Sequence, residues 1–263
     1  EKRRFGEAGG TVVLEECLEG PELSVITLTD GQTIMPLEPA RDHKAVFDGD
    51  KGPNTGGMGV VTPVAVMPRM RSQIESQIIF PTVHAMNREG RRYQGFLYAG
   101  LMLTNQGPRV LEYNCRLGDP ETQPLLMRLQ SDLVPLLLAT AEGKLDTMEA
   151  PVWDPRVAVC VVACSGGYPG DFKKGIPIFG LDRVVTGPDL QVFHAGGHPR
   201  RALAIVGELG EPLAAPAHGN HQSVLPGAQV EEWQPGGGRP TVGGQARAIP
   251  HLAEGVVLLG VHA

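Results

Sequence analysis

The chain has 263 residues, 41% of them apolar, and a formal net charge of −6. The length suits one large domain or two small ones, the apolar fraction argues against global disorder, and the acidic balance argues against a protein whose main task is to bind nucleic acid. No apolar run reaches the roughly 18 residues that predict a membrane-spanning helix, and the N-terminus lacks the apolar core of a signal peptide.

The first half of the chain predicts strands and one long helix. Residues 11–38 have strand composition, and Asp30-Gly31 between two β-rich runs predicts a two-residue hairpin loop. Residues 68–89 predict a helix, with apolar side chains four apart and Pro81 as a break or kink. Residues 95–103 and 109–115 predict two further strands, joined by a short polar turn.

A second helix is expected over residues 118–143, with Asp119 as its N-cap and Pro120 as its first residue. Residues 156–164 predict a central strand. The four cysteines, in apolar contexts and at spacings that match no zinc pattern, predict buried, reduced thiols, typical of a cytoplasmic protein.

The strand at 109–115 carries the first candidate site. Side chains alternate along a strand, so Val110, Glu112 and Asn114 are expected on one face. A carboxylate and an amide oxygen about 7 Å apart can share one hard cation such as Mg²⁺. A polar face exposed to solvent is the alternative.

The residues that follow this strand strengthen the site. Arg116 and Asp119 come directly after it, where Asp119 is expected to begin a helix. A guanidinium beside a helix N-terminus is a common way to bind an anion. A helix cap alone would explain Asp119, but it leaves Arg116 unexplained.

The stretch "DGDKGPNTGGMG", residues 48–59, is rich in glycine and shows no strand or helix period. Its backbone N–H groups could approach phosphate oxygens, with Lys44 and Lys51 adding positive charge. The spacing is not that of a P-loop, and a solvent loop is the alternative. His43, just before it, is by itself more typical of a structural histidine.

Residues 14–24, "LEECLEGPELS", form the third candidate cluster. A strand-end backbone can bind a purine edge, and a nearby carboxylate can hold ribose hydroxyls. Solvated surface carboxylates are the alternative.

Together these stretches resemble a known family. "VVLEECLEGPELS", "DHKAVFDGDKGPNTGGMG", "VLEYNCRLGDPETQ" and "GGYPGD" occur in this order and are similar to the phosphoribosylamine–glycine ligases (glycinamide ribonucleotide synthetases), which are ATP-grasp enzymes. The resemblance covers residues 10–195 closely and 201–215 weakly. It implies ligation of glycine to 5-phosphoribosylamine through a glycyl phosphate, giving glycinamide ribonucleotide, ADP and phosphate in purine biosynthesis.

The resemblance also implies roles for individual residues. The cofactors are ATP and Mg²⁺, or Mn²⁺, with the metal held by Glu112 and Asn114. The adenine and ribose would contact Glu16, Cys17, Leu18 and Glu22. The catalytic residues would be Lys44, Arg116 and Asp119. The substrate and phosphate loop would comprise Asp42, His43, Asn54, Thr55, Gly56, Gly57 and Gly59. We expect residues 48–59 to act as a mobile lid that keeps water from the acyl phosphate.

The expected fold is α+β: the C-terminal portion of an ATP-grasp domain over residues 1–150, with an antiparallel sheet and helices, then a small α/β unit over 151–215. The poorly patterned tail, 216–263, is expected to be disordered or frame-shifted. The chain starts inside the family's pattern and loses it after Ala215, so we expect an incomplete enzyme, inactive alone, whose complete form is monomeric and binds neither nucleic acid nor membrane. Another ATP-grasp carboxylate–amine ligase and a non-catalytic fragment are the alternatives.

Overall fold

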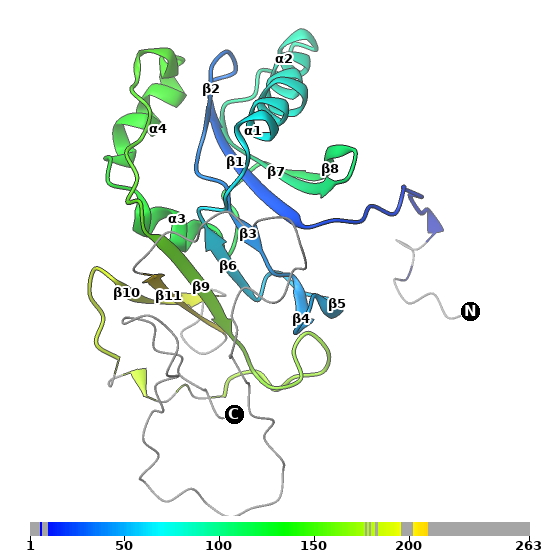
Figure 1. Cartoon of the computed structure of the whole chain (residues 1–263), viewed down its shortest axis with the longest axis vertical. Helices are drawn as coiled ribbons and strands as arrows, with labels where there is room; N and C mark the ends of the chain where they lie inside the picture. The colour runs from blue at the N-terminus through cyan, green and yellow to red at the C-terminus, as the bar shows by residue number, and fades with distance from the viewer. Residues whose placement is uncertain are drawn as a thin grey trace, which may run out of the picture.

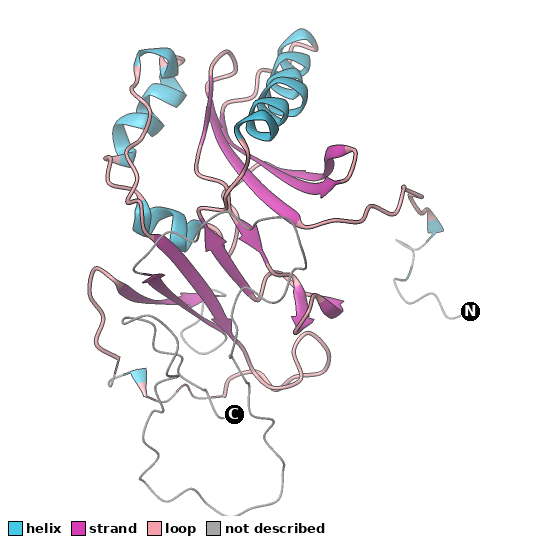
Figure 2. Cartoon of the chain, viewed as in Figure 1, coloured by secondary structure: helices cyan, strands magenta, loops and turns pink. Residues whose placement is uncertain are grey.

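The computed structural model describes residues 6, 10–176, 178, 180–181, 184–195 and 202–209. Within them the strands form three sheets in which every pairing is antiparallel. Figure 2 shows the strands in the middle of the molecule, with helices on either side of a hairpin at its upper end. The α+β fold class predicted from the sequence is confirmed.

The first sheet has the strand order β2-β1-β7-β8. Its strands are β1 (Glu22–Thr29), β2 (Ile34–Pro36), β7 (Gly95–Thr104) and β8 (Gly107–Asn114). The strands predicted at 95–103 and 109–115 are thereby confirmed. β1 is buried over seven of its eight residues, because both faces of this strand are covered.

The β1–β2 hairpin has a four-residue loop, Asp30–Thr33, in place of the predicted two-residue loop. The carboxylate of Asp30 accepts backbone hydrogen bonds from Gln32 and Thr33, which stabilises the longer turn. Gly31 supplies the positive φ, +92°, that the sequence predicted for this turn.

The strand expected over residues 11–18 does not form. These residues run away from the sheet as an extended chain, visible at the start of the trace in Figure 1. Val12, Val13 and Leu14 are more than 80% exposed. β-rich composition is therefore insufficient here, since no described strand lies alongside to accept its hydrogen bonds.

One face of the first sheet is covered by a continuous helical segment. It comprises α1 (Pro68–Ile74), the π-helical turn η2 (Glu75–Ile79) and α2 (Phe80–Arg88). Ile74, Ile79 and Val83 pack on apolar side chains of β1 and β7. Pro81 does not end the helix. It follows the widened π turn, which accommodates a residue that has no N–H to donate.

The helix predicted over residues 118–143 is two helices, α3 (Thr122–Arg128) and α4 (Leu133–Glu142), followed by a short 3₁₀ turn, η3 (Leu145–Thr147). Pro124 and Pro135 each lie in the first turn of one helix, the position that tolerates a missing N–H. Asp132 caps α4 by accepting from the Val134 N–H. Asp119 therefore caps neither helix, contrary to the prediction.

The second sheet has the order β10-β11-β9-β6-β3. Its strands are β3 (Arg41–Asp42), β6 (Gly59–Thr62), β9 (Val157–Ala163), β10 (Leu190–Ala195) and β11 (Ala202–Leu209). β9 is central, as predicted for residues 156–164. It pairs with β6, so this sheet joins segments on both sides of residue 150. The division into two units at that residue stays a prediction, and residues 216–263 lie outside the described part.

The third sheet is the two-stranded pair β4 (Ala45–Phe47) and β5 (Lys51–Asn54). The glycine-rich stretch 48–59 therefore contains regular structure, contrary to its lack of strand periodicity. Gly49, Asp50 and Gly52 adopt the positive φ angles of a tight turn. Alternation of apolar and polar residues does not predict such a turn.

All four cysteines are free thiols, as predicted, but the prediction of burial is wrong for two of them. Cys17 and Cys115 are exposed, Cys164 is half-buried and Cys160 is buried. None of the helices within the described ranges has the length and apolarity required to cross a bilayer.

Candidate nucleotide and metal site

The second face of the first sheet is polar where it approaches β3. Glu22 and Ser24 alternate along β1, and Glu112 and Asn114 lie opposite Gly100 and Tyr98 on the neighbouring strand. Glu112 and Asn114 thus share a face, as predicted. A bulge at residue 111 shifts the register, and Val110 pairs with Leu101 instead of continuing that face.

Lys44 connects this face to the second sheet. It lies between β3 and β4, and its Nζ is 3.0 Å from Oε2 of Glu22 and 3.7 Å from Oε1 of Glu112. Partial burial acts to lower the pKa of Lys44, but the hydrogen bond and charge of Glu22, together with Glu112, raise it above its usual value. The lysine is therefore a fixed positive charge between two predicted ligand-binding carboxylates.

Two carboxyl groups are buried near one another in this part of the molecule. Asp42 is 6% exposed and Glu121 is 2% exposed. Burial first, and the charge of Glu121 second, raise the pKa of Asp42 to about 8, although Lys44 opposes the shift. Among the described residues Asp42 Oδ1 has no hydrogen-bond partner. At neutral pH the Asp42 carboxyl therefore holds a proton.

Glu121 is held by a short hydrogen-bonded chain. Ser24 Oγ donates to Glu121 Oε1 at 2.8 Å and lies 2.9 Å from the hydroxyl of Tyr98. Because Ser24 has a single hydroxyl proton, Tyr98 is the donor in the second bond. Burial and the nearby charge of Glu121 raise the pKa of Tyr98, so this donor stays protonated.

The glycine-rich loop closes over Asp42. Thr55 N–H and Oγ1–H both donate to the carbonyl oxygen of Lys44, at 2.7 and 2.8 Å, and Gly57 N–H donates to Thr55 Oγ1. Gly57 has φ +124°, and a Cβ on it would lie 2.4 Å from Pro120 Cδ and 2.8 Å from Asp42 Oδ1. A side chain at this position has no room, which explains why glycine stands there.

His43 faces the turn of the β4–β5 hairpin. Its Nδ1 is 3.7 Å from Asp50, whose other oxygen accepts from Arg41 at 3.2 Å. Burial, followed by the charge of Arg41, lowers the pKa of His43, so the imidazole is neutral at pH 7 and its contact with Asp50 is not an ion pair. The structural role that the sequence favoured for an isolated histidine fits this position.

Several predicted site residues lie outside this cluster. Arg116 donates to the neighbouring Leu117 carbonyl, and Asp119 accepts from Gln123. Asn54 ends β5, and Gly59 begins β6, where a Cβ would lie 2.7 Å from the Cys160 carbonyl oxygen. Gly56 donates to the Tyr168 hydroxyl at 3.4 Å. The exposed, extended segment at the start of the described chain carries three more: Glu16, Cys17 and Leu18. Their predicted ligand contacts stay predictions.

Sequence reasoning missed three members of the cluster. Glu121 follows Arg116 and Asp119 but has no predicted site role, Ser24 ends the candidate stretch 14–24 without a role of its own, and Tyr98 lies in the strand predicted over 95–103. One signal for Glu121 was available: it directly follows Pro120 within the "NCRLGDPETQ" motif, whose neighbouring residues were assigned to the site. Ser24 and Tyr98 gave no comparable signal, because the partners are far apart in the chain. Ser24 is 97 residues from Glu121 and 74 residues from Tyr98.

The donor set at Glu112 and Asn114 suits a hard cation. Both offer oxygen ligands, and the ammonium of Lys44 lies 3.7 Å from Glu112 Oε1. Within the described ranges no group of three or more His, Cys, Asp or Glu side chains could hold a metal ion. A cation here would need further oxygen ligands from phosphate or water, which is the usual situation for Mg²⁺.

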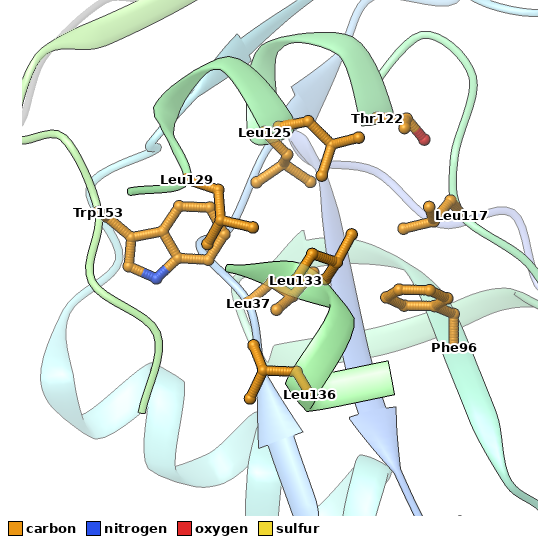
Figure 3. A pocket seen from close by; sticks show the side chains of 10 residues that line it. Leu37, Phe96, Leu117, Thr122, Leu125, Leu129, Leu133, Leu136 and Trp153 are labelled. Atoms are coloured by element: carbon orange, nitrogen blue, oxygen red, sulfur yellow. The ribbon is translucent and has the colours of Figure 1, made fainter. Parts of the chain in front are cut away.

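An apolar pocket lies under α3 and α4, separate from the polar cluster. Figure 3 shows Trp153, Leu125 and Phe96 around it. Its remaining lining residues are Leu37, Leu117, Thr122, Leu126, Leu129, Leu133 and Leu136. The pocket belongs to the packing between the sheet and the helices, with no charged side chain in its lining.

Comparison with known families matches the first part of the chain. Residues 1–122 match the model described as phosphoribosylglycinamide synthetase, ATP-grasp (A) domain. A phosphoribosylamine–glycine ligase of Rhodopirellula baltica is 52% identical over 196 residues, which are 74% of this chain and 45% of the relative. One from Vibrio vulnificus is 49% identical over 221 residues, covering 83% and 51%. The chain thus spans about half the length of the curated relatives it matches.

Solved structures show the same relationship. The crystal structure of phosphoribosylamine–glycine ligase from Thermotoga maritima superposes with a TM-score of 0.61 at 35% identity, covering 74% of this chain and 49% of that one. An L-amino acid ligase from Bacillus licheniformis gives a TM-score of 0.51 at 18% identity, over 73% and 47%. At that identity the second likeness shows a shared fold alone.

Proposed function

The chain belongs to the phosphoribosylglycinamide synthetase family, with residues 1–122 in its ATP-grasp (A) domain, and from that premise we propose that it contributes the metal-binding side of a ligase site. The proposed reaction joins glycine to 5-phosphoribosylamine at the expense of ATP, through a glycyl phosphate. The products are glycinamide ribonucleotide, ADP and phosphate. The family's relatives are named for this activity.

One observation carries the proposal: Glu22, Lys44 and Glu112 converge on one face of the first sheet from three separate segments. In the proposed site Glu22 holds ribose hydroxyls, and Glu112 with Asn114 holds the metal. The divalent ion would neutralise phosphate charge during transfer. Lys44 stabilises negative charge on the transferred phosphoryl group, since its ammonium is fixed by carboxylates in a half-buried position.

The loop that covers Asp42 has a proposed part in excluding water. An acyl phosphate hydrolyses readily, so a cover over the site protects it. Thr55 and Gly57 supply a hydrogen-bonded loop segment that closes down on Pro120 and Asp42. His43, Asn54, Gly56 and Gly59 keep their proposed assignment to the substrate and phosphate loop, and Arg116 and Asp119 their assignment beside the phosphates.

The metal and nucleotide assignments are tested by calorimetry. ATP is titrated into the chain with and without Mg²⁺, and the expected result is binding that depends on Mg²⁺ and is lost in Glu112→Ala. Glu149→Ala is the matched control, because it removes an exposed carboxylate and is expected to bind like the parent chain. ATP affinity that ignores both Mg²⁺ and Glu112→Ala would contradict the proposal.

The substrate assignment needs its own measurement. We expect ATP-dependent phosphate release, where it occurs, to require glycine and 5-phosphoribosylamine together. Bicarbonate that replaces glycine in this assay would instead favour a carboxylase-type member of the ATP-grasp enzymes. The proposed location is the cytoplasm, the proposed metal is Mg²⁺ or Mn²⁺, and the complete protein is proposed to be monomeric.

A further inference from the structure

The main chain at Lys44 is fixed while its side chain spans two sheets. The Lys44 carbonyl accepts two hydrogen bonds from Thr55, one from the amide and one from the hydroxyl. Lys44 lies in the short connection between β3 and β4, yet its ammonium lies against Glu22 of β1 and Glu112 of β8. The Lys44 side chain therefore extends from a hydrogen-bonded backbone near β3 and β4 to the first sheet.

The charge balance around this ammonium is uneven. Two carboxylates lie within 3.7 Å of Nζ, and both are partly buried, with 28% and 51% of their side-chain surface exposed. Like charges on one sheet face repel, and a single ammonium compensates only one of them. A cation with two charges would compensate both, so the local field favours a divalent ion wherever the ammonium is displaced.

We propose that Lys44 is an internal stand-in for the divalent cation: its ammonium occupies the neighbourhood of Glu112 until the metal arrives, and then moves to phosphate oxygens. This inference rests on the proposed metal role of Glu112. Lys44 then has two successive partners, Glu112 and the phosphate oxygens. Its ammonium competes with the free metal ion for Glu112 and strengthens binding of the metal–nucleotide complex.

A purely structural tie between the sheets makes the opposite prediction. If Lys44 only holds Glu22 and Glu112 in place, its removal disorders Glu112 and weakens metal binding. If it is a stand-in, its removal leaves Glu112 uncompensated and strengthens metal binding. The sign of the change in metal affinity therefore separates the two roles.

The experiment measures Mn²⁺ binding to the chain without nucleotide, by electron paramagnetic resonance or calorimetry. Lys44→Gln and Lys44→Met are each expected to bind Mn²⁺ about tenfold more tightly, as expected for the loss of a unit positive charge near 4 Å from a ligand. Lys144→Gln is the matched control: it removes the same charge from an exposed position after α4, where the ammonium pairs with Glu142, and it is expected to change the affinity less than about twofold because of screening.

The second arm repeats the titration with ATP present, where Lys44→Gln is expected to bind Mn²⁺·ATP about tenfold more weakly, since a phosphate partner is lost. Circular dichroism and thermal melts verify that each variant is folded. If Lys44→Gln does not fold, Lys44→Met serves in its place, because methionine retains the aliphatic stem of the lysine.

Each contrary result has a distinct meaning. Unchanged or weaker Mn²⁺ binding in both folded Lys44 variants overturns the stand-in role, while the proposed metal site survives if Glu112→Gln still abolishes binding. Mn²⁺ affinity that does not respond to Glu112→Gln overturns the metal site and the stand-in role together.

Discussion

The two faces of the first sheet are built from the same strands but differ in character near β3. Toward α1 and α2, the face consists of fully buried aliphatic side chains such as Leu101 and Ala99. Toward β3, the second face presents Ser24, Tyr98 and Glu112. Farther along the second face, Ile26 and Leu28 are buried in an apolar cluster. Alternation along each strand produces both faces at once, since neighbouring residues point in opposite directions.

The difference separates stability from binding. The helix-covered face is mainly explained by its packing, although the buried Thr27 Oγ1 on that face also has no hydrogen-bond partner among the described residues. Beside the other face, Asp42 Oδ1 of β3 is buried without a partner among the described residues, and Lys44 is shared by two carboxylates. A buried carboxyl oxygen without a partner near a lysine shared by two carboxylates favours a ligand site there.

The largest effect is expected on the helix-covered face. Leu101→Ala removes a side chain that is 0% exposed and is expected to destabilise the chain by about 2–5 kcal/mol through a cavity. Denaturant unfolding measures this loss. Val134→Ala, at a position 58% exposed on α4, is the control and should change stability by less than about 0.5 kcal/mol. A mild effect of Leu101→Ala would break the contrast between the faces.

Asp42→Asn is expected to have the next largest effect, and it depends on pH. A carboxyl whose native pKa is raised to about 8 stabilises the fold fully below its unfolded value near 3.9, and the contribution is lost as pH rises to 8. The amide cannot ionise, so the variant should gain on the order of 3 kcal/mol relative to the parent chain between pH 4 and pH 9. Urea unfolding at both pH values measures it, and a pH-independent difference would contradict the raised pKa.

A smaller effect is expected at the loop that covers the polar face. Gly57→Ala combines a left-handed φ of +124° with a Cβ that meets Pro120 and Asp42, so the loop should shift at a loss of about 1–3 kcal/mol. Amide hydrogen exchange over residues 55–58 should accelerate. Gly90→Ala is a useful comparison, because Gly90 also has positive φ, +72°, but no atom within 4 Å of an added Cβ.

The smallest stability effect is expected at Glu112. Its side chain is 51% exposed and its ion pair with Lys44 is long, at 3.7 Å, so Glu112→Gln should change the unfolding free energy by less than about 0.5 kcal/mol. Thermal melts measure this. A near-neutral effect on stability, together with lost metal binding, would show the division between the two faces most clearly; a large destabilisation would contradict it.

Much of this division could be predicted from local sequence patterns. Apolar and β-rich runs identified β7, β8 and β9, and four-residue spacing predicted the helical segment over 68–89. The shared face of Glu112 and Asn114 follows from strand geometry alone. Local sequence patterns failed to predict secondary structure where contacts with distant segments determine it. Residues 11–18 have strand composition without a described partner strand, and the helix predicted over 118–143 is two helices, the second of which begins after its cap Asp132 with Pro135 in its first turn.

The candidate site was predictable in its residues more than in its contacts. Lys44, Glu22 and Glu112 each came from a separate stretch, and only the fold brings their charges within 3.7 Å. The role of Glu121 depends on burial against Ser24 and Asp42, which no local pattern encodes. The bulge at residue 111 is similar, because it depends on the register with β7.

The pairing of β6 with β9 has a practical consequence for anyone who wishes to shorten this protein. Cutting the chain after η3 would remove the partner of Gly59–Thr62 and leave a row of backbone amides and carbonyls without hydrogen bonds. An unpaired strand edge of this kind can form backbone hydrogen bonds with other copies of the chain. A shortened version ending at residue 150 is therefore expected to precipitate or form inclusion bodies, even though every residue of the polar cluster would still be present.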